Sequence, residues 1–264
     1  MMPCKGDTMT YETIGFAVSE GIATLTLNRP QVMNALSSRM RAEITEAVTT
    51  LPQEARCLVI TGAGRGFCSG QDLTDRAAAA DLESTLRNEY EPMLRAIRAC
   101  RAPVIAAVNG VAAGAGANLA LAADVVIAAE SASFIQAFTR IGLVPDAGGT
   151  FIIPRAVGAA RALGMMLFAE PVSARQAAGW GLIWEALPDD SFAEGVAARA
   201  RQLAQGPTAA YLAIRQAVAA STQNDMDAQL ALEARLQGAA GRTADFTEGV
   251  TAFLEKRPAR FTGR

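Results

Sequence analysis

The stretch from residue 103 to residue 150 constrains the fold of this chain most. Residues 104–108 form a short apolar run ended by an Asn-Gly pair, which is typical of a buried strand. Residues 112–117 contain nothing larger than alanine, and residues 118–123 have helical character. Residues 124–129 indicate a second strand. We therefore expect a strand, a turn of very small residues, a helix and another strand.

The turn of small residues has two interpretations. Backbone amides at the start of a helix lack partners within the helix, and the helix dipole adds positive potential there. With no side chains in the way, a phosphate or a developing oxyanion can approach these amides closely. The second interpretation is close packing of the helix against the sheet, which also requires residues as small as glycine and alanine. Both interpretations stay open on these residues alone.

Strand and helix patterns alternate through the first part of the chain. Residues 16–27 predict a β-hairpin, residues 38–51 a helix capped by Ser37 or Ser38, and residues 57–61 a strand. This alternation predicts the α/β class, with a parallel or mixed sheet covered by helices. From residue 207 onward the pattern predicts helices alone. We expect a core of residues 1–205 and a C-terminal helical region of residues 206–264 that serves assembly.

The chain has 264 residues and no histidine. This excludes Ser-His-Asp and Cys-His mechanisms and a histidine-ligated metal, so proton transfer falls to other side chains. A net charge of −2 without a long basic block argues against nucleic-acid binding. No apolar run reaches the roughly 20 residues that cross a membrane, and the N-terminus shows no apolar signal segment, so we expect a cytoplasmic protein. The four cysteines form no C-x-x-C pair, and we interpret them as reduced.

Two glycine-rich segments, residues 62–66 and 110–116, do not fit a nucleotide site. They lack both G-x-G-x-x-G after a strand and the G-K-[ST] ending of a P-loop. Between them, residues 67–73 read F-C-S-G-Q-D-L, which also follows a strand and permits a tight turn at Ser69-Gly70. Two strand-end turns in neighbouring units can each direct one amide at the same oxygen. The pair of turns therefore favours an oxyanion hole.

A set of motifs is highly specific when taken together. It comprises L-T-L-N-R-P at 25–30, N-A-L at 34–36, G-x-G-F-C-S-G-Q-D-L at 64–73, P-V-I-A-A-V-N-G-V-A-A-G-A-G at 103–116, A-D at 123–124, G-L-V-P-D-A-G-G-T at 142–150 and S-A-x-Q-A-x-x-x-G-L-I at 173–183. With them the chain resembles the crotonase (enoyl-CoA hydratase/isomerase) superfamily over essentially its whole length.

This resemblance implies a fold and a substrate. The fold would be a spiral of repeated ββα turns with a C-terminal helical trimerisation region, assembled as a homotrimer or hexamer. The substrate would be an acyl-CoA thioester whose carbonyl accepts hydrogen bonds from the backbone amides of Gln71 and Ala115. It implies no metal, and no cofactor beyond the coenzyme A of the substrate.

Departures from the family pattern bear on the reaction. Hydratases of the superfamily carry two glutamates that hold and activate water, and the matching positions here are Asn118 and Phe138. Asparagine is no base near neutral pH, and phenylalanine has nothing to ionise. The remaining acid nearby is Asp146 in V-P-D-A-G-G-T. By resemblance it would be the catalytic acid/base, and the alternative is an N-cap of the helix that starts near Gly148.

The resemblance also implies a substrate-binding set around the thioester. Arg29 and Lys256 would meet the phosphates of coenzyme A, or else be solvated charges. For Asp72 we expect a turn cap, and for Asp124 a structural role. The full set is Arg29, Ser69, Gly70, Asp72, Leu73, Gly114, Asn118, Phe138 and Lys256.

Five segments look most like the ring 1,2-epoxyphenylacetyl-CoA isomerases within this superfamily: residues 67–76, 109–117, 141–150, 180–184 and the tail 248–264. That likeness implies conversion of 2-(1,2-epoxy-1,2-dihydrophenyl)acetyl-CoA to oxepin-CoA and a shift of 3-enoyl to 2-enoyl double bonds, with Asp146 as acid/base. One alternative is an enoyl-CoA hydratase that holds water in another way. Another is a non-catalytic assembly protein that binds CoA thioesters. A hydrolytic dehalogenase is disfavoured because that branch uses a histidine.

Overall fold

The predicted hairpin starts the larger of two sheets. In the computed structural model, which describes residues 11–75 and 80–264, β1 (Ile14–Ser19) pairs antiparallel with β2 (Ile22–Leu27). Glu20 and Gly21 join them, both with positive φ, as a two-residue hairpin turn requires. The other strands follow in parallel, in the order β3 (Cys57–Gly62), β5 (Val104–Val108), β7 (Val125–Ala129) and β10 (Glu185–Leu187).

Short strands build the second sheet. Its order is β4 (Gly66–Cys68), β6 (Val111–Ala113), β8 (Ser133–Ile135) and β9 (Val172–Ser173). β3, β5 and β7 of the first sheet are each followed by one strand of the second and then by helical structure. This repeat is the ββα spiral that the sequence analysis predicted, and the α/β class is confirmed. The sequence missed β8 and β9 because strands of two or three residues are too short to show a period.

Helix α1 (Ser38–Thr49) begins at Ser37, whose side chain accepts a hydrogen bond from the Met40 amide. The cap is therefore one of the two predicted serines. None of the helices within residues 11–75 and 80–264 combines the length and the apolar character that crossing a bilayer demands. Other helices of the core are α3 (Leu82–Thr85), α4 (Glu91–Arg98), α5 (Ala115–Leu121), α6 (Gly149–Val157), α7 (Ala159–Phe168), α8 (Ala174–Gly179) and α9 (Phe192–Gln205).

The sequence pattern of residues 82–100 predicts one helix with a polar face, but in the structure this helix is interrupted. A π-helical turn, η2 (Leu86–Tyr90), lies between α3 and α4, and the Glu91 amide donates to the Leu86 carbonyl five residues back. Pro92 follows within the first turn of α4. Because proline has no N–H to donate back along the helix, the regular ladder cannot run through this point.

The small-residue segment is not a simple turn. Residues 111–113 form β6, and the helix begins at Ala115, three residues earlier than the sequence indicated. Gly114 joins the two with a φ of 52°, a backbone conformation that glycine adopts at no steric cost. The sequence also predicts a strand over residues 182–187, and β10 covers only the end of it.

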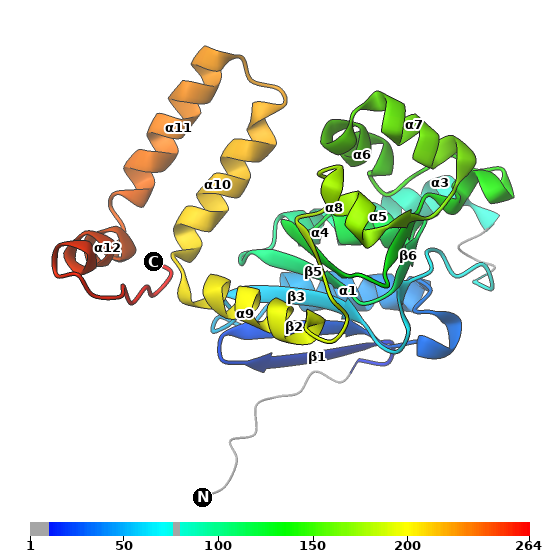
Figure 1. The fold of residues 1–264 in the computed structure, drawn as a ribbon, viewed down its shortest axis with the longest axis horizontal. Helices are drawn as coiled ribbons and strands as arrows, with labels where there is room; N and C mark the ends of the chain where they lie inside the picture. The colour runs from blue at the N-terminus through cyan, green and yellow to red at the C-terminus, as the bar shows by residue number, and fades with distance from the viewer. Residues whose placement is uncertain (1–10, 76–79) are drawn as a thin grey trace, which may run out of the picture.

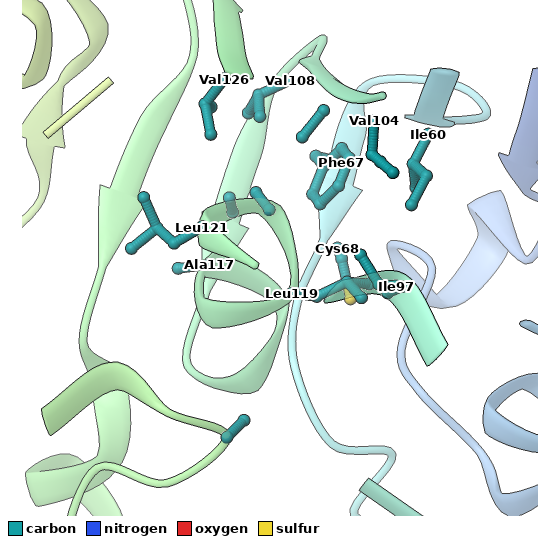
Figure 2. Close-up of a cluster of buried hydrophobic side chains, with 14 of the residues drawn as sticks. Ile60, Phe67, Cys68, Ile97, Val104, Val108, Ala117, Leu119, Leu121 and Val126 are labelled. Atoms are coloured by element: carbon teal, nitrogen blue, oxygen red, sulfur yellow. The ribbon is translucent and has the colours of Figure 1, made fainter. Parts of the chain in front are cut away.

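Helix α5 packs its small residues directly against β4. A Cβ on Gly116 would lie only 2.4 Å from the Cys68 carbonyl oxygen, so no side chain fits there. The close-packing interpretation is therefore confirmed at this position. Farther along, α5 buries larger side chains in the main core (Figure 2), a cluster that includes Phe67, Val108, Ala117, Leu119 and Leu121.

The chain after the core forms α10 (Thr208–Ser221), α11 (Met226–Ala240) and α12 (Ala244–Leu254), which extend away from the sheets (Figure 1). The break that we placed after residue 205 falls at the end of α9. Arg215 of α10 ties this region to the core through an ion pair with Asp124. Asp124 also accepts a hydrogen bond from the Val104 amide at 2.7 Å. The structural role expected for Asp124 is confirmed.

Apolar side chains on α10–α12 face solvent in the single chain, among them Ile214, Val218, Leu230, Phe246 and Phe253. Exposed apolar patches of this kind mark contact surfaces.

We expect the purified protein to be a homotrimer or hexamer at micromolar concentration, measured by light scattering. Leu230→Glu should lower the mass, whereas Gln237→Glu on the same helix should not. A stable wild-type monomer would contradict this expectation.

Candidate active site

The two predicted strand-end turns meet at one place. β4 and β6 are parallel neighbours, so their carboxyl ends reach the same edge of the second sheet. Gly70 follows β4 with a φ of +97°, and a Cβ on it would lie 2.9 Å from the Ala113 carbonyl oxygen and 3.5 Å from the Ala115 nitrogen. The segment that leads into Gln71 is therefore packed against the start of α5.

Two backbone amides are left free at this junction. The Leu36 amide donates to the Gly70 carbonyl, and the Asp72 amide donates to the Leu36 carbonyl. In such a parallel bridge the residue between the two bonds, Gln71, directs its own N–H away from Leu36. Ala115 is the first residue of α5, so its N–H has no partner inside the helix. In the described ranges, neither amide donates a hydrogen bond to another residue.

Asp146 lies in the turn between η3 (Ala137–Ile141) and α6. Its side chain does not cap α6, because the N-cap residue is Gly148 and no side-chain cap bond is present. The capping alternative is therefore wrong. The carboxyl Oδ1 atom is buried and has no hydrogen-bond partner in the described part of the chain. Burial raises the pKa of Asp146 to about 6.

Asn118 and Phe138 both lie beside these groups. Asn118 is completely buried, and its Nδ2 donates to the backbone carbonyl of Asp146 at 2.8 Å. Its Oδ1 accepts a hydrogen bond from Gln136 Nε2 at 3.0 Å. Phe138 is also buried, and a Cβ on Gly114 would lie 3.7 Å from its ring. An amide that is already paired and an apolar ring thus occupy the two positions that the sequence analysis matched to glutamates of the hydratases.

Arg29 and Asp72 are paired with each other. Arg29 Nη1 lies 2.7 Å from Asp72 Oδ2 and also donates to the Ala35 carbonyl at 2.7 Å. Thr74 donates to the other Asp72 oxygen, so Asp72 caps a turn, as expected. Burial acts to raise the pKa of Asp72, but hydrogen bonds from Thr74 and Arg29 outweigh it and hold the pKa below its usual value.

The other predicted binding residues lie at different distances from the junction. Ser69 is exposed and donates from its hydroxyl to the Val32 carbonyl at 3.2 Å. The Leu73 side chain is 64% exposed beside the Asp72 turn. Lys256 follows α12, which lies at the opposite side of the molecule from α5 and α6 (Figure 1). Within one chain, Lys256 is therefore not brought together with the rest of the set.

Cys68 lies under the junction and is no nucleophile. Its thiol is fully buried and contacts the Asn34 carbonyl at 3.1 Å. Burial raises its pKa to about 12, so the thiolate is not formed near neutral pH. Cys57 and Cys100 are likewise buried and free, in line with the sequence interpretation, and Cys4 lies outside the described residues.

Comparison with known proteins decides the family. Residues 17–264 match the model of the family described as enoyl-CoA hydratase/isomerase. The chain belongs to this family. It is thus an enzyme of the crotonase family that acts on CoA thioesters.

Relatives within the crotonase family carry names for both reactions. A protein of Rhodobacter capsulatus named "Probable enoyl-CoA hydratase" is 63% identical over 257 residues, covering 97% of this chain and 100% of the relative. The "1,2-epoxyphenylacetyl-CoA isomerase" of Escherichia coli is 47% identical over 254 residues, covering 94% and 97%. The crystal structure of an enoyl-CoA hydratase from Bacillus anthracis superposes with a TM-score of 0.89 at 30% identity, covering 96% and 100%.

One residue of the site was not singled out from the sequence. Gln136 is only 1% exposed, follows β8, and pairs with Asn118 through its side-chain amide. A single glutamine beside a short apolar strand carries no signal of its own. Its partner becomes visible only when β8 and α5 are placed side by side.

The raised pKa of Asp146 predicts a pH-dependent stability. The folded value of about 6 lies above the ordinary 3.8, so the folded state binds more protons and loses stability as pH rises from about 4 through 6. Asp146→Asn cannot ionise and should be more stable than wild type at pH 8, by up to about 3 kcal/mol. The gain should vanish below pH 4. Denaturant unfolding of both proteins between pH 4 and 8 measures this, and a less stable variant at pH 8 contradicts it.

Proposed function

We propose that this chain is an acyl-CoA isomerase with Asp146 as its general acid/base. The observation that carries the proposal is the state of the Asp146 carboxyl, which is buried, unpaired at Oδ1 and raised in pKa to about 6. It lies next to α5, whose first amide is free. A carboxyl with a pKa close to the working pH can both take and return a proton, which a proton shift requires.

The reaction would proceed in two proton transfers. The Asp146 carboxylate removes a proton from C2 of a 3-enoyl-CoA, and the electron pair of that C–H bond moves onto the thioester oxygen. The amides of Gln71 and Ala115 would hold this enolate oxygen. The double bond then forms between C2 and C3, and the protonated Asp146 gives its proton to C4. No atom is gained or lost, so the step needs no co-reactant.

For the acyl group we propose 2-(1,2-epoxy-1,2-dihydrophenyl)acetyl-CoA, which would rearrange to oxepin-CoA. The motif likeness in residues 67–76 and 248–264 supports this choice. The 47% identity to a protein named for that substrate supports it as well. Phe138 supplies an aromatic ring beside Gly114, near the proposed thioester site.

The second candidate is hydration of a 2-enoyl-CoA. The name of the Rhodobacter capsulatus relative favours it. Against it stand Asn118, whose amide already bonds Asp146 and Gln136, and Phe138, which cannot orient water. The non-catalytic thioester-binding protein considered from the sequence does not agree with membership of this enzyme family, and it would show binding without turnover.

The assay that separates these candidates uses purified protein with epoxyphenylacetyl-CoA, a 3-enoyl-CoA and crotonyl-CoA. We expect isomerisation of the first two and little hydration of the third. Asp146→Asn should lower isomerisation by about 10²–10⁴, the usual worth of a positioned acid/base. Asp189→Asn changes a carboxyl that follows β10 and accepts a hydrogen bond from the Ser131 hydroxyl, and it should leave the rate unchanged. Full activity of Asp146→Asn would end the proposal.

The proposed oxyanion hole is tested by Ala115→Pro. Proline is tolerated at the first position of a helix, so the change removes one N–H without breaking α5. Turnover should fall by about 10²–10³, as on loss of one oxyanion donor elsewhere. Ala244→Pro makes the same change at the first position of α12 and should leave turnover intact. Unchanged activity in a folded Ala115→Pro variant would remove Ala115 from the mechanism.

A further inference from the structure

Few bonds hold the Asp146 carboxyl. Among the described residues its Oδ1 has no partner, and the hydrogen bond that acts on its pKa comes from the backbone of Asp146 itself. The position of the carboxyl is therefore set by the backbone of the turn that carries it. This backbone is unusual, because Ala147 has a φ of 48° and Gly148 a φ of 84°. A left-handed alanine costs free energy and persists only where neighbouring groups hold it.

The group that holds this turn is the side chain of Asn118. Its Nδ2 donates to the backbone carbonyl of Asp146 itself, at 2.8 Å. Asn118 lies on α5, one helical turn after Ala115. One side chain thus ties the residue with the proposed acid/base to the helix that carries the proposed oxyanion donor.

The other end of the Asn118 amide is fixed as well. Its Oδ1 accepts from Gln136 Nε2 at 3.0 Å, and both residues are at most 1% exposed. Buried amides pair strongly because leaving either one unpaired is costly. Both polar atoms of the Asn118 side chain are therefore engaged with the protein.

The fit around the amide is tight. A Cβ on Gly149 would lie 2.5 Å from Asn118 Nδ2 and 2.8 Å from its Oδ1. The Gly149 amide in turn donates to the Asp146 carbonyl at 2.9 Å, closing the turn. Asn118 therefore contacts the turn at Asp146 and at Gly149, and these two contacts hold the turn at one position along α5.

We propose that Asn118 is a positioning residue that fixes the distance between the Asp146 carboxyl and the Ala115 amide, and that Gln136 acts through Asn118. The proposal rests on the proposed role of Asp146 as acid/base. A displacement of about 1 Å in a reacting group can cost 10²-fold in rate. Residues 118 and 149 would then depend on each other, because only a residue without a side chain at position 149 leaves room for the Asn118 amide.

The first test compares Asn118→Ala and Gln136→Ala with wild type in the isomerase assay. Asn118→Ala should lower kcat by about 10–10², with KM changed less than threefold, because the turn is released but the thioester site is kept. Its kcat–pH midpoint should fall, since a released turn lets water reach the carboxyl. Gln136→Ala should lower kcat less, and should add nothing when Asn118 is already alanine. Unchanged kcat and midpoint in folded Asn118→Ala overturns the proposal.

The second test approaches the same contact from the other side. Gly149→Ala alone should lower both Tm and kcat, because its Cβ presses on the Asn118 amide. In the Asn118→Ala background the same change should cost no stability and no further rate, since the space is then open. Equal losses from Gly149→Ala in both backgrounds would show that the two positions are not matched, and would overturn that part of the proposal.

Two control variants separate a loss of positioning from a loss of stability and from a failure of the proposed function. Asn109→Ala removes another bridging amide, one that bonds the Gly62 amide and the Gly64 carbonyl, and it should lower Tm while keeping kcat. If it lowers kcat as much as Asn118→Ala, the effect is only one of stability. Asp146→Asn measured beside these variants tests the proposed function. An active Asp146→Asn ends that function, whereas an inactive Asp146→Asn with a fully active Asn118→Ala ends only this inference.

Discussion

The close approach of α5 to the end of β4 is the constraint on which the rest of the structure depends. Gly116 lies against the Cys68 carbonyl and Gly70 against the Ala113 carbonyl, so side chains are excluded from both sides of the contact. Only this approach brings the Gln71 and Ala115 segments together. The free amides therefore result from the packing. The anion-binding interpretation and the close-packing interpretation of the small-residue segment apply to the same contact.

The pKa values of the two carboxyls, Asp72 and Asp146, differ because the fold gives a cationic partner to one of them and not to the other. Asp72 has an arginine and a turn to stabilise its charge, and its pKa stays low. Asp146 has burial without a compensating cation, and its pKa rises to about 6. One carboxyl is thus charged and held by its partners, whereas the other is buried and unpaired at Oδ1. The fold sustains this unpaired group, together with the left-handed Ala147, through bonds to the backbone of the turn.

Much of the fold could be predicted from the sequence because its signals are local. The hairpin at residues 14–27, the capped helix at 38–49 and the buried strand at 104–108 each carry their own period or cap. Sequence patterns fail to predict an element that is very short, or one whose ends are set by contacts or by the conformation of an adjacent residue. β8 and β9 are too short to show a period, and Pro92 breaks a helix whose apolar pattern runs on. The start of α5 at Ala115 depends on a glycine conformation that composition does not reveal.

The sequence by itself determined which groups are available for chemistry. It has no histidine, it carries the family motifs, and it places Asn118, Phe138 and Asp146 at the positions that bear on the reaction. Only the tertiary structure decided how these groups are used. Whether Asp146 caps a helix or stands free, whether Arg29 faces solvent or Asp72, and which atom Asn118 bonds all depend on segments far apart in the chain. Hydrogen bonding and desolvation act over a few ångströms in space, and a linear pattern does not contain those distances.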